Sequence, residues 1–404
     1  MATPRIAFAA VLAVTALEFV RPQDWIAPLA RAPFGIASAL LLLVLLLLWG
    51  RRDLLRDPIV RVLGVLPVVA LAWTPFATNR FWAFQSFKIL LIDWITVLAL
   101  ASFVDRPARL RALLGLLLAA FAAHGLYAIG HAGKGYNAWF ADENDLAAGM
   151  CAALPFAVFA LVAARGAWLR LATAAGALVL VAGVVASASR GGLVALVATG
   201  GAMLVFAKRR LAIAAAVAAA ALLLALLAPP AYWADMQTMF DPADETRASR
   251  IQFWGHALAI WLDHPILGVG PGNAPWVIGA YESFDTQVGA SAAGRAVHSI
   301  YFTLLPEWGL VGVALYGALG ALFVARCVRL LRAPRTPELH AQTWARALLC
   351  SAAACAAAGV FLSLLYYPHL YFLLGLALAL EACSAAASPA PGATAPARRR
   401  GPTP

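Results

Sequence analysis

Twelve predominantly apolar stretches follow one another along this chain of 404 residues. A helix needs about 20 mostly apolar residues to cross roughly 30 Å of hydrocarbon, and most of these stretches approach that length. Hydrophobic residues make up 63% of the chain and charged residues 12%, whereas a soluble domain is about half apolar and a quarter charged. This composition excludes a soluble enzyme and a disordered protein. We therefore expect an all-α, polytopic membrane helix bundle with about 12 transmembrane helices, at 6–20, 34–50, 58–76, 88–104, 110–130, 145–164, 168–187, 191–207, 211–228, 299–325, 343–363 and 367–384.

The distribution of lysine and arginine predicts the orientation of the bundle. If the N-terminus is cytoplasmic, 21 of the 30 basic residues fall in inside segments and 9 fall outside, and the alternation holds at every loop. Both termini are therefore expected in the cytoplasm. The formal net charge of +11 mostly reflects this topology, so no nucleic-acid partner is expected.

The chain divides into N-terminal transmembrane helices (1–187), a core (188–325), C-terminal transmembrane helices (326–384) and a cytoplasmic tail (385–404). The tail is rich in Ala, Pro and Ser and is expected to be disordered. The core contains one long external loop, 229–298, which is far more polar than its surroundings. A loop of that length is usually functional.

This loop is expected to contain an amphipathic helix from Arg250 to Asp263. Ile251, Trp254, Leu258 and Trp261 fall on one face of such a helix. The aromatic content of this face is typical of a helix that lies at the membrane interface.

Arg190 lies between two apolar runs on the external side, in the segment Ser187-Ala-Ser-Arg-Gly-Gly192. One interpretation is an arginine that snorkels from the end of a span. The other is an anion clamp, because a guanidinium presents a rigid fork of donors that matches phosphate oxygens. Ser187 and Ser189 would add hydroxyl donors, and the two glycines would allow a close approach.

Arg250 opens the expected external helix, with Arg247 shortly before it. Arg247 is near Asp244 and Glu245 and is expected to be a solvated charge. Arg250 could instead point toward the cavity that Arg190 faces. Two arginines that converge on one place would suit a diphosphate.

His298 lies where the polar loop re-enters the membrane, three residues after Arg295. A histidine here could cap a span, or it could take a proton from a hydroxyl, since imidazole titrates near neutrality. Glu307 lies in the following apolar stretch, where a carboxylate either pairs with an arginine or serves a function. The spacing of possible ligands predicts no metal, and Gly270-Pro-Gly272 lacks the flanking elements of a nucleotide loop, so no cofactor is expected.

Several stretches together resemble the O-antigen ligase and O-antigen polymerase superfamily, over roughly 185–320. They are SRGGLVAL, then a long loop with RIQFWGHAL and DHPILGVGPGN, then VHSIYFTLLPEWGLVGVALYG. The segment Phe19-Val-Arg-Pro-Gln23 also resembles such sequences. The resemblance implies a metal-independent glycosyltransferase of the bacterial inner membrane with a periplasmic active site. Such enzymes pass a glycan from undecaprenyl diphosphate to an acceptor hydroxyl.

Residue by residue, the resemblance implies that Arg190 and Arg250 bind the donor diphosphate and that His298 is the catalytic residue. Many relatives have His-Asn where this chain has His298-Ser299, which concerns the acceptor contacts. Fixed cations would stabilise the departing diphosphate, and a neutral histidine would assist deprotonation of the acceptor. We expect a single inverting displacement, with Arg247, Arg295, Ser189 and Glu307 in supporting roles.

Three acceptors fit the resemblance. A ligase transfers the glycan to lipid A core, a polymerase extends another lipid-linked glycan, and a protein O-oligosaccharyltransferase modifies a protein. One external loop of this length, rather than two larger ones, favours the ligase. The alternative from a different class is a small-solute transporter, which would have buried charges near the bilayer midplane. The distinctive charged residues of this chain cluster at the external edge, which favours an enzyme.

Overall fold

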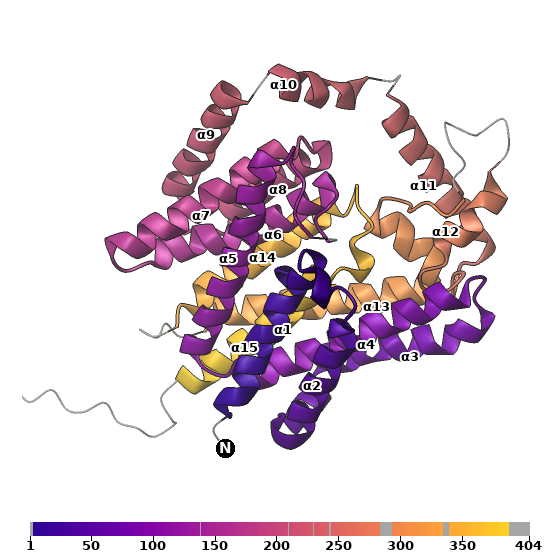
Figure 1. Ribbon diagram of the computed structural model, residues 1–404, viewed down its shortest axis with the longest axis horizontal. Helices are drawn as coiled ribbons and strands as arrows, with labels where there is room; N and C mark the ends of the chain where they lie inside the picture. The colour runs from indigo at the N-terminus through magenta and orange to yellow at the C-terminus, as the bar shows by residue number, and fades with distance from the viewer. Residues whose placement is uncertain are drawn as a thin grey trace, which may run out of the picture.

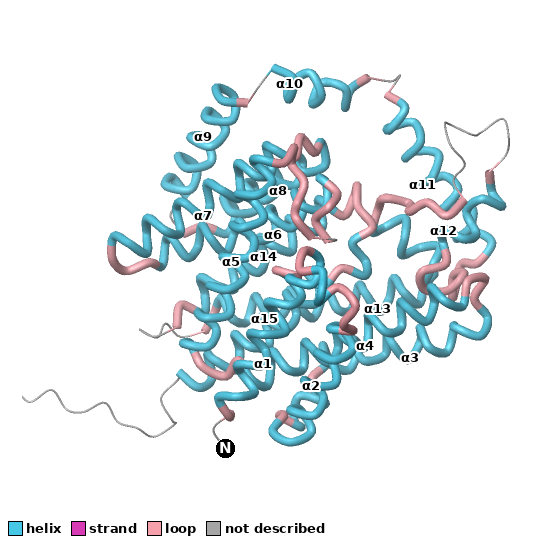
Figure 2. Tube along the Cα trace, viewed as in Figure 1, coloured by secondary structure: helices cyan, strands magenta, loops and turns pink. Residues whose placement is uncertain are grey.

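The structure is a computed structural model that describes residues 3–137, 139–208, 210–228, 230–241, 244–282, 293–333 and 339–387. Within these ranges the regular elements are helices and there is no strand, which confirms the all-α class (Figure 2). The α-helices are α1 (Arg5–Phe19), α2 (Phe34–Trp49), α3 (Pro58–Trp73), α4 (Arg80–Phe103), α5 (Pro107–Gly130), α6 (Glu143–Ala163), α7 (Ala167–Ala186), α8 (Arg190–Phe206), α9 (Arg210–Leu227), α10 (Pro230–Gln237), α11 (Glu245–Asp263), α12 (Ala274–Val277), α13 (Ile300–Leu331), α14 (Ala341–Ala358) and α15 (Pro368–Ala387).

Each of the twelve apolar stretches forms a helix: α1 to α9, α13, α14 and α15. In the described part of the chain, eight helical segments are long and apolar enough to cross a membrane. Shorter apolar helices occur at Phe34–Trp49, Arg190–Phe206 and Arg210–Ala219. A multi-pass membrane protein is therefore confirmed, and the count of about twelve crossings stays a prediction.

The core of the bundle forms around two central helices. α6 packs against α7, α8 and α14, and α4 packs against α3, α2 and α15. Contacts of α14 with both α13 and α15 join these two groups. The buried part of α6 is rich in Ala, with Gly149 among them, and small residues let helix backbones approach closely.

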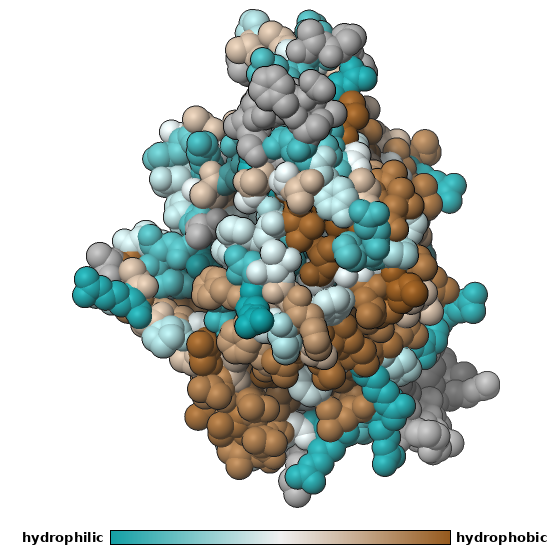
Figure 3. Space-filling view, turned by 90° about the vertical axis from the view of Figure 1, so that its right-hand side faces the viewer, coloured by the Kyte–Doolittle hydropathy of each residue, from teal (hydrophilic) through white to brown (hydrophobic). Residues whose placement is uncertain are grey.

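Many large apolar side chains face outward, which is expected where the surroundings are hydrocarbon rather than water. They include Leu47 on α2, Val68 on α3, Leu171 on α7 and Leu310 on α13, each more than half exposed. Figure 3 shows broad apolar areas on the side of the molecule that includes α3, α11 and α13. In a soluble protein, surfaces of this kind would cause aggregation.

The long loop expected at 229–298 contains α10, α11 and α12, and α9, α10 and α11 form an arch along one edge of the molecule (Figure 1). The expected helix from Arg250 to Asp263 is confirmed, and it begins earlier, at Glu245. Its buried face is formed by Phe253, His256, Ala257 and Ile260. Of the apolar face expected from the sequence, Ile251 and Leu258 are 55% and 40% exposed, as an interfacial helix requires, whereas Trp254 stacks on Phe302.

The predicted segments do not behave as separate units. The expected boundary at residue 326 falls inside α13, and α14 and α15 pack against α6 and α4 of the N-terminal part. The expected disordered tail, 385–404, begins inside α15, and residues 388–404 lie outside the described part of the chain.

Candidate active site

The turn between α7 and α8 places Arg190 as the first residue of α8. Ala188 adopts a left-handed conformation (φ 49°), which reverses the chain between the two helices. The Ser189 hydroxyl then caps α8, accepting a hydrogen bond from Gly192 N at 2.9 Å, and donates to Asn144 Oδ1 at 2.6 Å. Ser189 thus fixes the start of the helix that carries Arg190 to the start of α6.

The Arg190 side chain reaches the connection between α10 and α11. Its Nη1 atom donates to Thr238 Oγ1 at 2.8 Å and to Asp244 Oδ2 at 2.9 Å. Asp244 also caps α11, because its other carboxylate oxygen accepts from Arg247 N at 2.7 Å. Arg190 therefore positions the N-terminus of the helix that carries Arg250.

Arg250 lies in the second turn of α11, with its guanidinium carbon 5.8 Å from the ring centroid of Phe361. Phe361 also lies beside Gly191, where a Cβ atom would come within 3.3 Å of the Phe361 Cβ. The pKa of Arg250 is lowered, first by burial and then by the positive charge of Arg190. The structure thus brings Arg190 and Arg250 into the same region around Phe361.

His298 immediately precedes the Ser299 cap of α13 and is held in the left-handed region with φ 54°. Such a conformation costs a residue other than glycine about 1–3 kcal/mol, and residues of this kind cluster at functional sites. Burial lowers the pKa of His298, and the nearby charge of Arg250 lowers it further. Both effects favour the neutral imidazole, the form that can accept a proton.

Asp142, like Asp244, is an acidic group whose charge acts on this region. Its negative charge opposes the lowering of the pKa of both Arg250 and His298. Asp142 caps α6 through Asn144 N at 2.8 Å, and Asn144 in turn accepts from Ser189. The caps of α6 and α8 therefore form one connected group.

Two of the expected supporting residues lie at the edge of this region. Arg247 is exposed, and its backbone amide takes part in the α11 cap. Arg295 is exposed and lies over the ring of Phe253, 4.9 Å from its centroid. Its positive charge also contributes to lowering the pKa of His298.

Glu307 binds backbone amides rather than an arginine. Its carboxylate accepts from Gly272 N at 2.8 Å, from Ala274 N at 3.3 Å and from the hydroxyl of Tyr366 at 2.5 Å. These bonds hold the Pro265–Asn273 loop against α13, where Gly309 breaks the regular helix with φ 59°. Glu307 supports the Pro265–Asn273 loop, and the hydrogen bonds of the described residues do not bring it into contact with Arg190, Arg250 or His298.

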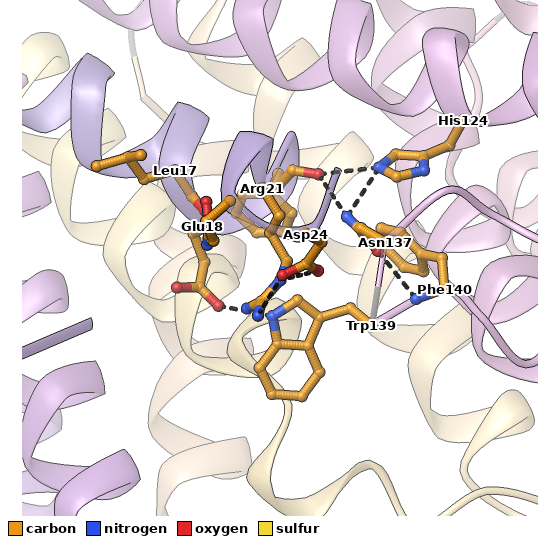
Figure 4. Close-up of polar contacts among 10 residues, drawn as sticks. Leu17, Glu18, Arg21, Asp24, His124, Asn137, Trp139 and Phe140 are labelled. Atoms are coloured by element: carbon orange, nitrogen blue, oxygen red, sulfur yellow. Dashed lines mark hydrogen bonds and ion pairs between the residues drawn. The ribbon is translucent and has the colours of Figure 1, made fainter. Parts of the chain in front are cut away.

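The end of α1 is fixed beside this region by a second polar network (Figure 4). The Phe19 carbonyl accepts from Asn137 Nδ2 at 3.1 Å and lies 2.9 Å from His124 Nε2. Trp139 Nε1 donates to Glu18 at 3.0 Å, and Arg21 lies over the Trp139 ring. This network explains the Phe19–Gln23 segment as a connection between α1 and the α5–α6 loop.

Sequence reasoning missed Phe361 and the pairing of Asp244 with Arg190. Asp244 precedes a helical segment at a position typical of an N-cap, so the sequence indicated its capping role. Its ion pair with Arg190 joins residues 54 positions apart, and nothing in the sequence indicated this pair. Phe361 follows α14, far from both arginines in the sequence.

The fold and the candidate site define a class: a multi-pass α-helical membrane protein with two arginines and a histidine at one end of its bundle. Groups of three or more His, Cys, Asp or Glu that could hold a metal ion do not occur within the described ranges. Residues 175–317 match the family described as O-antigen ligase, which supports membership of the O-antigen ligase superfamily. The matched segment runs from α7 into α13 and contains Arg190, Arg250 and His298. A glycosyltransferase-type enzyme of the ligase or polymerase kind follows from this match. No curated protein matches the chain.

Proposed function

We propose that this protein is a ligase-like glycosyltransferase that moves a glycan from undecaprenyl diphosphate to an acceptor hydroxyl, in lipid A core above all. The observation that carries the proposal is that Arg250 lies over Phe361, which also lies beside Gly191 at the start of α8, directly after Arg190. The positive charge of Arg250 also lowers the pKa of His298. The two guanidinium groups repel each other, although Asp244 pairs with Arg190. They are stabilised when a dianionic group such as a diphosphate binds between them.

His298 serves as the general base in a single inverting displacement. The acceptor oxygen forms a bond to the anomeric carbon, and the bond from that carbon to the diphosphate oxygen breaks. The electron pair of the broken bond stays on the diphosphate, where Arg190 and Arg250 stabilise it. The hydroxyl proton moves to His298, and the negative charge of Asp142 favours the imidazolium that forms.

The site faces the periplasm of a bacterial inner membrane, and both termini lie in the cytoplasm. The asymmetry of lysine and arginine supports this orientation. The lipid tail of the donor enters from the bilayer between helices, and the reaction needs no metal. Arg247, Arg295, Ser189 and Glu307 support the site: Ser189 and Glu307 through the contacts described above, and the two arginines through their charge.

Substitution of His298 by Ala tests the catalytic role. We expect glycan transfer to fall at least a hundredfold with unchanged protein level, since general base catalysis typically contributes 10²–10⁴-fold (~3–5 kcal/mol). His264→Ala is the matched control, because His264 is an exposed histidine of the same external segment. Full turnover in His298→Ala would remove the general base from the mechanism.

Surface glycans of a deletion strain identify the acceptor. Bare lipid A core with accumulated long lipid-linked glycan supports the ligase. Single-repeat glycans on the core would indicate a polymerase instead, and an unmodified protein with normal lipopolysaccharide would indicate a protein O-oligosaccharyltransferase. Unchanged glycans together with altered uptake of a small solute would indicate a transporter.

A further inference from the structure

The turn that follows α14 lies where three segments of the candidate active site meet. It carries Phe361, which lies outside the family match because the matched segment ends at residue 317. The backbone of the turn continues directly from the end of the helix, since Phe361 N donates to Ala358 O at 2.9 Å. The end of α14 therefore determines where the Phe361 side chain emerges.

The same turn is attached to α13 directly after His298. The carbonyl oxygen of Gly359 accepts from Ile300 N at 2.7 Å and from the Ser299 hydroxyl at 3.4 Å. Gly359 has no room for a side chain, since a Cβ atom there would come within 2.7 Å of Ile300 Cγ2. The start of α13, with His298 before it, is thus held against the turn that carries Phe361.

The Phe361 ring also packs against the start of α8. A Cβ atom at Gly191 would come within 3.3 Å of Phe361 Cβ and within 3.4 Å of Phe361 Cδ2. Carbon atoms in favourable contact lie about 3.5–4.0 Å apart, so an alanine at this position would push the ring away. The sequence suggested that the glycine after Arg190 gives space to a ligand, whereas in the structure the aromatic ring lies beside it.

The third contact of the ring is with Arg250. The guanidinium carbon lies 5.8 Å from the ring centroid, within the range of a cation–π interaction. No hydrogen bond or ion pair of the described residues holds this guanidinium. An arginine side chain is long and flexible, so a guanidinium without such bonds needs another group to orient it. The Phe361 ring is the group in position to do so.

We infer that Phe361 is a positioning residue, which holds the Arg250 guanidinium next to the start of α8 and thereby aligns both arginines on the donor diphosphate. The inference rests on the proposed function for the identity of the anion. An aromatic ring suits this role because it attracts a cation without neutralising it, and the positive charge stays available to phosphate oxygens. The ring acts through Arg250 and does not contact the reacting atoms itself.

The test measures binding of farnesyl diphosphate, a short prenyl diphosphate, to the full-length protein purified in a neutral detergent. Phe361→Leu keeps an apolar side chain and removes the aromatic ring, and we expect it to weaken binding about tenfold. Phe76→Leu should leave binding unchanged. It is the matched control, because Phe76 is 78% exposed in the α3–α4 connection.

A second replacement keeps the shape of the ring and separates positioning from packing. 3,4,5-Trifluorophenylalanine at position 361 is close to phenylalanine in size, but its fluorine atoms withdraw the electron density that attracts a cation. We expect it to weaken binding about threefold or more, with an unchanged thermal unfolding temperature. A residue that only fills space would tolerate this replacement, so binding equal to that of the wild type would overturn the inference.

A double-mutant cycle shows whether the ring acts through Arg250. We expect Arg250→Ala to weaken binding more than Phe361→Leu does, and the double variant to lose less than about twofold beyond Arg250→Ala. A further tenfold loss in the double variant would overturn the inference, because the ring would then act independently of Arg250. Binding that Arg250→Ala itself leaves unchanged would be a different failure: it would remove the proposed diphosphate site, and the inference with it.

Discussion

Arginines at the two ends of the bundle are treated differently by the fold. At the end away from the candidate active site, Arg326 on α13 is 5% exposed and pairs with Asp57 at 2.6 Å and with Glu381 at 2.8 Å. Arg109 is also buried there and pairs with Asp105 at 3.1 Å. At the other end, Arg250 lies over Phe361, and no carboxylate of the described chain forms an ion pair with it.

This difference separates structural from functional charge. The positive charge of a buried arginine is balanced when it pairs with carboxylates. Arg326 pairs with two of them and thereby joins α13 to the start of α3 and to α15. Arg250 instead stands near the like charge of Arg190, and burial and that charge together lower its pKa. Burial and the repulsion from Arg190 both disfavour the charged form of Arg250. A bound anion would offset both effects.

Arg326→Ala tests most directly whether the paired arginine stabilises the fold. We expect the free energy of unfolding to fall by about 3–5 kcal/mol, because Asp57 and Glu381 lose the cation between them. Thermal unfolding of purified protein measures the loss. Arg329→Ala is the control: Arg329 is 64% exposed and 3.9 Å from Glu381, so about 0–1 kcal/mol is expected. Equal effects of the two variants would show that burial of the pair is unimportant.

Arg250→Ala should reduce glycan transfer and leave the stability of the protein intact. We expect glycan transfer to fall about 10²–10³-fold, as for the removal of one preorganised transition-state donor. Stability should be unchanged or slightly increased, since a like-charge repulsion is removed. Transfer assays and unfolding measured on the same preparation distinguish the two effects. Arg80→Ala, an exposed arginine at the start of α4, should change neither, and a loss confined to stability in Arg250→Ala would make Arg250 structural.

Glu307→Gln tests a charge that is structural although it lies at the active-site end. The glutamine amide would place its NH₂ group against Gly272 N or Ala274 N, so that two donors face each other. We expect a loss of about 1–3 kcal/mol of stability, as for an unsatisfied buried group. Transfer should fall only in proportion to the folded fraction. A large loss of turnover in fully folded protein would place Glu307 in the chemistry.

The sequence predicted the helices well because hydrophobic length is a local property. All twelve apolar stretches are helices, and the amphipathic helix around Arg250 is present. The sequence did not predict that Asp244 binds Arg190 or that Phe361 lies beside Arg250, because these contacts join distant segments. It also left Glu307 between two roles, since its partners are backbone amides, which every residue type can supply. The residue types thus indicated the candidate chemistry, whereas the contact partners of these residues could be identified only from the packing of the folded chain.

Asp244→Asn is a milder test of the active-site charges. Asparagine caps a helix about as well as aspartate, so α11 should stay intact. The ion pair with Arg190 is removed, and Arg190 becomes more available to a diphosphate. Because the pair is partly exposed, we expect the KM for the lipid-linked donor to fall up to about fivefold, with kcat little changed. A rise in KM would show instead that Asp244 positions Arg190 for the donor.

The smallest expected effect is on the pH dependence of transfer, and here two charges should act in opposite directions. A general base works in its neutral form, so transfer should be lost as the pH falls through the pKa of His298, which lies below its usual value. Asp142 raises this pKa and Arg295 lowers it. Asp142→Asn should therefore move the acid limb of kcat/KM to lower pH, and Arg295→Gln should move it to higher pH. Both shifts should shrink in high salt, since Arg295 is exposed. Two shifts in the same direction would mean that the acid limb reports a group other than His298.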